Sequence, residues 1–242
     1  MSYELIDCTG VILAGGENRR MPVPKAFIKI NGKRIIEKNL KLMKRLFKEV
    51  FVVTNQPEAY FYLGAAMLGD IYNIRGPMTG IFTSIVNSAY TWIFVTACDM
   101  PFISEHLIRY MSSKRDDYDA VVPKSSRSAF NPPTSPFNKG GQRGIFKGGQ
   151  RGDFVEPLFA LYSKRLCHNM EKALVSGKTG MQDFLRNKEV RYITSGEIKG
   201  IDPEGKTFIN LNTPEDVRTH LCPEGINTCK ILPGSRLQEI RR

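Results

Sequence analysis

The chain has 242 residues, 41% of them hydrophobic and 24% charged, which is typical of a globular protein that buries a core. Of its net charge of +11, +6 lies within residues 124–152 and +3 within residues 218–242, so the remaining body carries only +2 and a nucleic-acid partner is not expected. No apolar stretch approaches the roughly 20 residues of a membrane-spanning helix, so no membrane contact is expected. The five cysteines are scattered without a CxxC pair, and the N-terminus lacks the basic run of a signal peptide. These features argue against a disulfide framework and predict a reduced, cytoplasmic protein.

The first half of the chain alternates between short apolar runs and amphipathic stretches. Apolar runs typical of strands buried on both faces occupy residues 10–13, 50–53 and 92–97. Apolar residues at spacings of three and four predict helices, and these positions are Ile35, Ile36, Leu40, Met43 and Phe47, then Ile81, Ile85 and Ala89, then Leu107, Ile108 and Met111. Further strands are expected at residues 120–123, 158–162, 190–194 and 208–211. The pattern predicts an α/β fold with a single doubly wound, mostly parallel sheet, in one domain over residues 1–217.

Residues 125–152 interrupt this pattern with a basic segment rich in Ser, Pro and Gly. It holds a tandem octapeptide, KGGQRGIF at 139–146 and KGGQRGDF at 147–154. Such a composition buries too little apolar surface to offset the entropy of ordering, so a disordered surface insertion is expected. The alternative is a glycine-rich arm that binds RNA or an acidic partner. The tail, residues 218–242, has weak periodicity and receives no role.

The loop after the first expected strand, LAGGENRRMPVPK at residues 13–25, is the most informative stretch. In an open parallel sheet it lies at the carboxyl edge, where ligands bind. Gly15 and Gly16 allow close backbone approach and offer N–H groups to phosphate oxygens, while Arg20 and Lys25 add two cations that would stabilise a leaving pyrophosphate. The spacing is neither that of a Walker loop nor that of a dinucleotide fingerprint. A tight turn with exposed basic residues is the alternative.

A carboxylate follows the third apolar run in the sequence Cys98-Asp99-Met100-Pro101. A carboxylate at the end of a buried strand is costly unless it is solvated or bound, and Mg²⁺ is typically held by one or two carboxylates with substrate phosphates. Asp99 is therefore predicted to bind Mg²⁺, with a turn or helix-capping Asp as the alternative. Cys98 is expected to be a small buried side chain rather than a nucleophile.

Weaker signals lie near the same predicted edge. Residues 75–80, RGPMTG, open a predicted helix whose first amides would suit an anion. Asp70 precedes them in a loop and would suit a base or ribose, and Asn55 follows the second strand. For these residues a plain turn or surface position is the alternative. The three histidines lack metal-ligand spacing and are expected at the surface: His106, His168 and His220.

Four motifs follow one another along residues 10–217: LAGG-x-x-x-RM-x-x-x-K, GPMTGI, CDMPF and NLNTPE. In this order and at these spacings they resemble the molybdenum cofactor guanylyltransferases. The resemblance implies a Rossmann-like nucleotidyltransferase fold and transfer of GMP from GTP to the terminal phosphate of molybdenum-molybdopterin, with release of pyrophosphate and Mg²⁺ as cofactor. It also implies molybdoenzyme apoproteins or their chaperones as further partners.

The resemblance assigns roles to individual residues. Catalysis would rest on Arg20, Lys25 and Asp99, with Asp99 as the metal ligand. The nucleotide would be bound by Leu13, Ala14, Gly15, Gly16, Lys25, Asn55 (or Thr54 beside it), Asp70 and Asp99. The pterin side would comprise Glu156, Asn210 and Asn212.

Two prolines depart from the family pattern. Pro22 stands where the family has Gly, and Pro24 where it has Asp, so backbone N–H contacts at these positions are absent. Pro-Lys also resembles the cytidylyltransferase relatives, although those read Leu-Ala-Ala-Gly at residues 13–16. GTP is the expected nucleotide, with CTP as the alternative and another sugar-phosphate-type nucleotidyltransferase as a further one. A phosphate nucleophile is already ionised at pH 7, so no general base is required.

Overall fold

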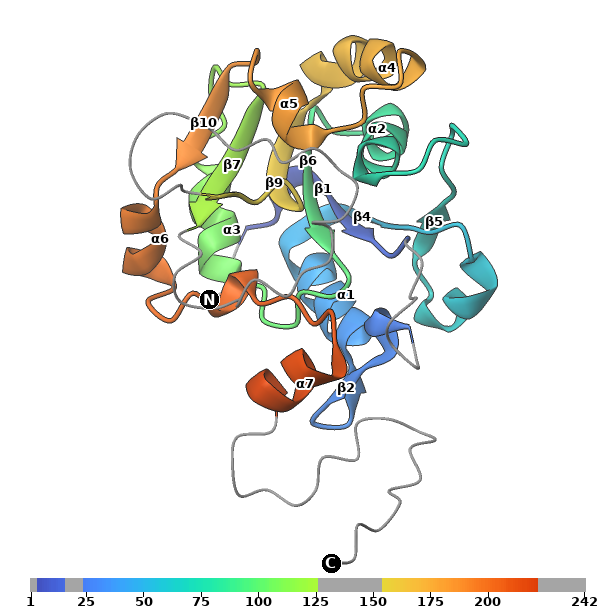
Figure 1. The fold of residues 1–242 in the computed structure, drawn as a ribbon, viewed down its shortest axis with the longest axis vertical. Coiled ribbons are helices and arrows are strands. Elements are labelled where there is room, and N and C mark those ends of the chain that lie inside the picture. Colours follow the sequence, from blue (N-terminus) through green and yellow to red (C-terminus); the bar gives the residue numbers. More distant parts are fainter. Residues whose placement is uncertain (1–3, 16–23, 126–153, 222–242) are drawn as a thin grey trace, which may run out of the picture.

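The computed structural model describes residues 4–15, 24–125 and 154–221. Eight strands form one sheet in the order β10-β7-β9-β6-β1-β4-β5, with β8 paired to β7 (Figure 1). Their bounds are β1 (Ile6–Leu13), β4 (Phe47–Val53), β5 (Ala66–Leu68), β6 (Trp92–Ala97), β7 (Ala120–Ser125), β8 (Phe154–Val155), β9 (Phe159–Ser163) and β10 (Val190–Ile193). A separate antiparallel pair consists of β2 (Lys29–Ile30) and β3 (Lys33–Arg34).

Most neighbours in the large sheet are parallel, which confirms the predicted doubly wound architecture. β1 pairs in parallel with β4 and β6, β4 with β5, and β10 with β7. β9 runs antiparallel to both β6 and β7, and β8 is antiparallel to β7. An apolar run carries no information about strand direction, so the reversed β9 was not predicted. As a result β1, β4, β5, β6, β7 and β10 all end at one edge of the sheet.

Helices cover both faces of the sheet (Figure 1). α1 (Ile35–Leu46), α3 (Glu105–Ser112) and α6 (Ser195–Ile201) pack on one face, and α2 (Pro77–Asn87), α4 (Cys167–Val175) and α5 (Met181–Leu185) on the other. The predicted helical periodicity holds, because Ile36, Leu40 and Met43 of α1 are buried against the sheet. Two of the positions predicted to be helical lie outside the helices, since Phe47 begins β4 and Ala89 follows the end of α2.

The strand expected at residues 208–211 is wrong. Residues Lys206–Phe208 form a 3₁₀ turn, and the chain then runs into α7 (Pro214–Leu221) without pairing in a described sheet. The apolar residues there serve a different purpose, because Ile209 and Leu211 pack with Ile28 and Ile35 in a separate apolar cluster that α7 joins through Val217. The other 3₁₀ turns within the described ranges are Lys25–Phe27, Pro57–Ala59, Phe61–Leu63 and Lys164–Leu166.

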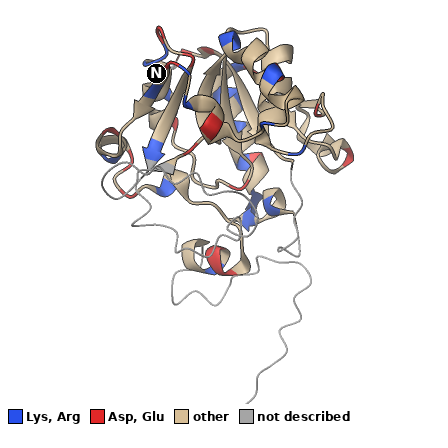
Figure 2. Cartoon of the chain, turned by 45° about the horizontal axis from the view of Figure 1, so that its top comes forward, with Lys and Arg blue, Asp and Glu red and all other residues tan. Residues whose placement is uncertain are grey.

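Residues 126–153 leave and re-enter the fold at one place, since Ser125 at the end of β7 is the register partner of Phe154 in β8. The expected disorder of the insertion concerns residues outside the described ranges and stays a prediction. Lys and Arg are spread over the whole described fold, with Asp and Glu among them (Figure 2). No described helix has the length and apolar character needed to cross a membrane.

Gly10 allows α1 and the start of β4 to approach the centre of β1. A Cβ there would stand 2.6 Å from Cδ2 of Phe47 and 3.0 Å from Cε of Met43, and the Phe47 ring is itself stacked on Phe94. We expect Gly10→Ala to lower the free energy of unfolding by about 1–3 kcal/mol through overpacking, measured by urea denaturation. Gly200→Ala, whose Cβ meets no described atom within 4 Å, is the control and should not destabilise. Equal midpoints for wild type and Gly10→Ala would contradict this packing argument.

Candidate active site

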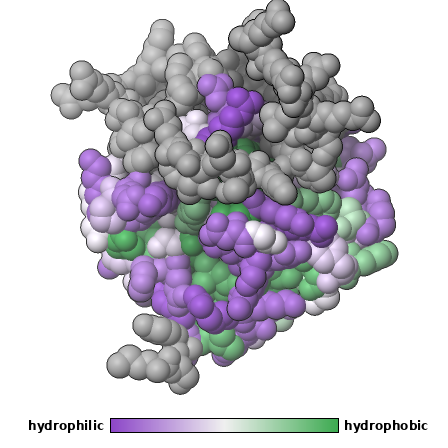
Figure 3. All heavy atoms as spheres, turned by 90° about the horizontal axis from the view of Figure 1, so that it is seen from below, coloured by the Kyte–Doolittle hydropathy of each residue, from purple (hydrophilic) through white to green (hydrophobic). Residues whose placement is uncertain are grey.

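The edge at which the parallel strands end collects residues from distant parts of the sequence (Figure 1). Ala14 follows β1, Asn55 follows β4, Asp70 follows β5 and Asp99 follows β6, while Lys124 lies at the end of β7. Figure 3 turns the lower end of Figure 1 towards the viewer, and its described surface is largely hydrophilic around smaller apolar patches. Polar side chains therefore gather where parallel α/β sheets bind ligands.

Lys25, Asp99 and Asn212 form the centre of this edge. Nζ of Lys25 donates to Oδ2 of Asp99 at 3.0 Å and to Oδ1 of Asn212 at 2.5 Å. The side chains of Lys25 and Asp99 are 24% and 18% exposed, so they are accessible to a ligand but held on one side by protein. The structure thus joins three residues that sequence motifs had singled out separately.

Asn212 is positioned by its neighbours in the NLNTPE motif. Leu211 is fully buried, and its N–H donates to the carbonyl of Asp99 at 3.0 Å, which fixes this segment against the loop after β6. The carboxylate of Asp216 accepts the N–H groups of Asn212 at 2.9 Å and Thr213 at 2.8 Å. Asn210, on the other side of Leu211, is partly buried. Asp216 was not predicted, although Thr-x-x-Asp before a helix is the signal of a capping box.

The backbone after β1 lies between the ends of β4 and β6. Ala14 donates its N–H to the Val53 carbonyl at 2.8 Å, and the Leu13 carbonyl accepts from Cys98 N–H at 3.0 Å. Gly15 is exposed, and a Cβ there would meet no described atom within 4 Å. Gly16, Arg20 and Pro22 lie outside the described residues, so their predicted roles stay predictions.

Tyr60 is a neighbour of this loop that the sequence pattern did not indicate. Its hydroxyl donates to the Ala14 carbonyl at 3.4 Å, and burial raises its pKa, so the hydroxyl remains a donor at neutral pH. An aromatic residue in the connection between β4 and β5 carries no signal that would separate this role from ordinary packing.

Asn55 and Asp70 bind one another at the ends of β4 and β5. Asn55 Nδ2 donates to Asp70 Oδ2 at 2.7 Å, and the Asp70 N–H donates to Asn55 Oδ1 at 3.0 Å. Thr54 is buried, and its hydroxyl accepts from the Gln56 N–H, so of the two predicted neighbours Asn55 is the one exposed. A Cβ on Gly80 of α2 would lie 3.6 Å from Asp70 Oδ1, so the helix opened by the RGPMTG motif passes beside this pair.

Glu156 lies in the turn between β8 and β9. In the sheet order β9 is next to β6 on the side opposite to β1, so Glu156 and the loop after β1 lie on different sides of β6. The Glu156 N–H donates to the Pro123 carbonyl at 3.0 Å, and its carbonyl accepts from Phe159 N–H at 3.2 Å. Beside it the ammonium of Lys124 lies 4.4 Å from the ring centroid of Tyr192, near the end of β10. The pairing of Lys124 with Tyr192 depends on the β7–β10 register, so the sequence alone gave no indication of it.

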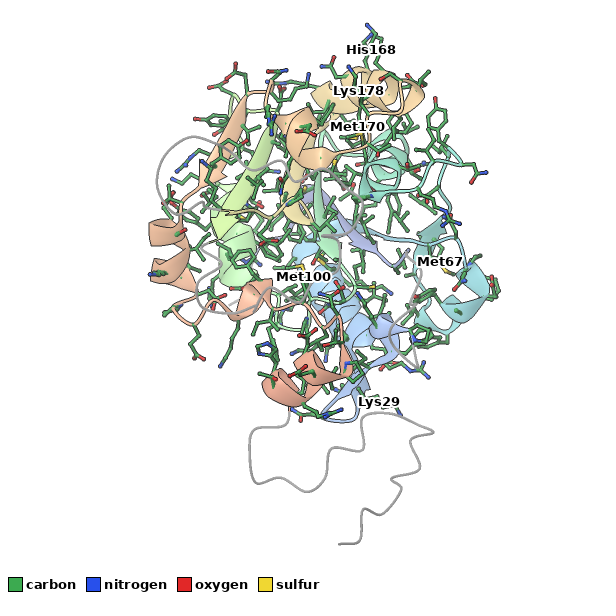
Figure 4. The ribbon with its side chains drawn as sticks, in the orientation of Figure 1. Lys29, Met67, Met100, His168, Met170 and Lys178 are labelled. Atoms are coloured by element: carbon green, nitrogen blue, oxygen red, sulfur yellow. The ribbon has the colours of Figure 1, made fainter. Side chains whose placement is uncertain are left out.

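The predicted surface position holds for two of the three histidines, whereas His220 in α7 is only partly exposed. His106 and His168 are exposed, and Figure 4 shows His168 on α4, far from Met100, which follows Asp99. Burial raises the pKa of the Cys98 thiol to about 12, so this side chain stays protonated at neutral pH. Within the described ranges no group of three or more His, Cys, Asp or Glu side chains could hold a metal, so a metal here would need ligands from substrate phosphates besides Asp99.

The chain is similar to known proteins over most of its length. The model of the MobA-like NTP transferase domain matches residues 10–192. A probable molybdenum cofactor guanylyltransferase of Pelotomaculum thermopropionicum is 29% identical over 94% of this chain and 98% of its own. A second such protein, from Peptoclostridium acidaminophilum, is 30% identical over 88% of this chain and 87% of its own.

A solved structure shares the fold. Molybdopterin-guanine dinucleotide biosynthesis protein A of Archaeoglobus fulgidus superposes with a TM-score of 0.68 at 22% identity, covering 87% of this chain and 95% of that one. The arrangement of sheet and helices is therefore that of a known nucleotidyltransferase fold.

Proposed function

Because the chain belongs to the MobA-like NTP transferase family, we propose that it transfers GMP from GTP to the terminal phosphate of molybdenum-molybdopterin. The observation that carries this proposal is the cluster of Lys25, Asp99 and Asn212, which unites three sequence motifs at the ligand-binding edge of the sheet. CTP as the donor and other acceptors are not favoured, because several relatives that match most of the chain are named as established or probable molybdenum cofactor guanylyltransferases.

The reaction forms one P–O bond and breaks another. An oxygen of the acceptor phosphate attacks the α-phosphorus of GTP, and pyrophosphate leaves from the opposite side. The attacking oxygen is already ionised at pH 7, which fits a site whose described part contains no histidine. Lys25, placed by Asp99 and Asn212, would compensate the negative charge that develops on the phosphates.

Mg²⁺ is the metal that we propose for this site, within a family that generally uses a divalent ion. Its donors would be the carboxylate of Asp99 and phosphate oxygens of the substrate, and oxygen ligands are those that Mg²⁺ prefers. The partly exposed Asp99 carboxylate and the nearby amide oxygen of Asn212 fit this donor set. A bound ion would supply positive charge to the phosphates, in addition to that of Lys25.

The two substrates would lie on opposite sides of Asp99. The nucleotide would occupy the side of β1, β4 and β5, with its phosphates at Ala14 and Lys25 and its guanosine at Asn55 and Asp70. The acceptor would occupy the side of β7, β9 and β10, where Glu156 and Lys124 lie. Asn210 would face it from the segment before α7.

We expect Lys124→Ala to raise the KM for molybdopterin severalfold and to leave the KM for GTP unchanged, because only the acceptor side loses a cation. The matched control is Lys188→Ala. Lys188 also stacks on an aromatic ring, that of Phe184 at 5.3 Å, but it precedes β10 and so lies at the opposite edge of the sheet. Steady-state kinetics with each substrate varied in turn would measure both constants. A change in the KM for GTP alone would place the acceptor elsewhere.

The deciding experiment is pyrophosphate release with GTP, ATP, CTP and UTP, each with and without molybdopterin. Release is expected with GTP and only when molybdopterin is present. Faster release with CTP would instead establish the cytidylyltransferase alternative.

The later fate of the product is also part of the proposal. Molybdoenzyme apoproteins or their chaperones would receive it, as the family resemblance suggests. A cytoplasmic site of action is supported by the thiols of Cys8, Cys98 and Cys167, which are unpaired within the described chain.

A further inference from the structure

A hollow of about 320 Å³ lies between α1 and the loop that follows Asp99. Its lining residues take no part in the contacts of the candidate active site described above. Lys38, Lys41 and Arg45 of α1 line the hollow, and no acidic residue of the described ranges does. Its volume is at the lower end of the range of small-molecule pockets.

The positive charge of the hollow is only partly compensated. Arg45 pairs with Glu105 of α3. Lys38 donates to the Pro101 carbonyl at 3.2 Å and lies 5.3 Å from the Phe102 ring centroid, and burial lowers its pKa. Lys41 is exposed, and no described residue pairs with it. The hollow is therefore suited to an anion that would contact Lys41 and the neighbouring cations.

Asn39 adds a hydrogen-bond acceptor beside these cations. Its side chain is fully buried and lines the hollow, and its Nδ2 donates to the Met100 carbonyl at 2.9 Å. This bond fixes the orientation of the amide, and within the described chain the other atom, Oδ1, accepts no hydrogen bond. A buried acceptor without a donor is unfavourable, so a ligand with a hydroxyl group would satisfy it.

We propose that this hollow is a second ligand site, for a phosphomonoester that also carries hydroxyl groups. Sugar phosphates and nucleoside monophosphates share this chemistry. The phosphate would bind Lys41 beside Lys38 and Arg45, and a hydroxyl would donate to Asn39 Oδ1. Lys38 and Asn39 also hold the carbonyls of Pro101 and Met100, so an occupant would act on the segment adjoining Asp99. The binding proposal does not depend on the proposed reaction.

Methyl NMR of the full chain would test it, with GMP, ribose 5-phosphate and inorganic phosphate as probes. Leu42 and Ile103 line the hollow and report on it, whereas Leu13 reports on the loop after β1. We expect GMP and ribose 5-phosphate to shift the Leu42 and Ile103 methyls in a saturable manner, and inorganic phosphate to bind more weakly. Lys41→Glu should weaken this binding by about tenfold or more, which corresponds to about 1.4 kcal/mol.

Lys44→Glu is the matched control, because it changes the net charge equally on the same helix. Lys44 donates to the Gly64 carbonyl and does not line the hollow, so binding should be unchanged. Binding of only one of the two organic phosphates would support the site and identify its source of phosphate. No shift at Leu42 and Ile103, a shift equal in Lys41→Glu, or equally tight binding of inorganic phosphate would overturn the proposal.

Discussion

Asp99→Asn is expected to lower the rate of pyrophosphate release by about a hundred- to a thousandfold while the protein stays folded. The substitution keeps the shape of the side chain but removes the charge that would hold the metal. Its cost to stability should stay within about 1 kcal/mol, because the ion pair with Lys25 is partly exposed to solvent. The release rate at saturating Mg²⁺ and GTP, together with the melting temperature, would measure both effects.

Asp116→Asn provides the control for this variant. Asp116 is exposed between α3 and the start of β7, at the edge of the sheet opposite to Asp99, and the same change there should alter neither rate nor melting temperature. Nearly wild-type turnover of Asp99→Asn at saturating Mg²⁺ would remove Asp99 from the proposed metal site.

Lys25→Ala is expected to slow GMP transfer by about a hundredfold or more. The substitution removes a cation from the phosphates and also separates Asp99 from Asn212, which Lys25 joins by its two hydrogen bonds. Lys29→Ala is the control, since Lys29 is exposed on β2 and Figure 4 shows it apart from Met100, which follows Asp99. Single-turnover rates would separate the chemical step from substrate binding.

The neighbouring arginines give a further comparison within the same assay. From the motif alone, Arg20→Ala should slow transfer at least as much as Lys25→Ala, and Arg19→Ala should have less effect because its position in the motif is variable. Equal losses for Arg19→Ala and Arg20→Ala would contradict this assignment. A fast Lys25→Ala variant would show that the cluster of Lys25, Asp99 and Asn212 is structural.

The strands and helices of the first half were predictable because their signals are local. A strand buried on both faces must be a continuous apolar run, and α1 must present apolar residues at spacings of three and four. Ser104 caps the start of α3 through another local signal, with its Oγ accepting the Leu107 N–H at 3.3 Å. The predicted strand at residues 208–211 was wrong, because burial of Ile209 and Leu211 under α7 produces the same apolar pattern without strand pairing.

The sequence by itself determined the fold class, because buried strands and amphipathic helices have local hydrophobic patterns. It also determined the family and the identity of most candidate site residues, because short motifs contain them. Only the tertiary structure decided which of those residues meet. Lys25 and Asn212 are separated by 187 positions, and their contact depends on Leu211 being buried and bonded to the carbonyl of Asp99. The stacking of Lys124 on Tyr192 likewise required the reversed β9, which keeps β7 parallel to β6 and brings the end of β7 to the same edge as Asp99. Long-range pairing of this kind follows from the packing of the whole sheet, which no local pattern encodes.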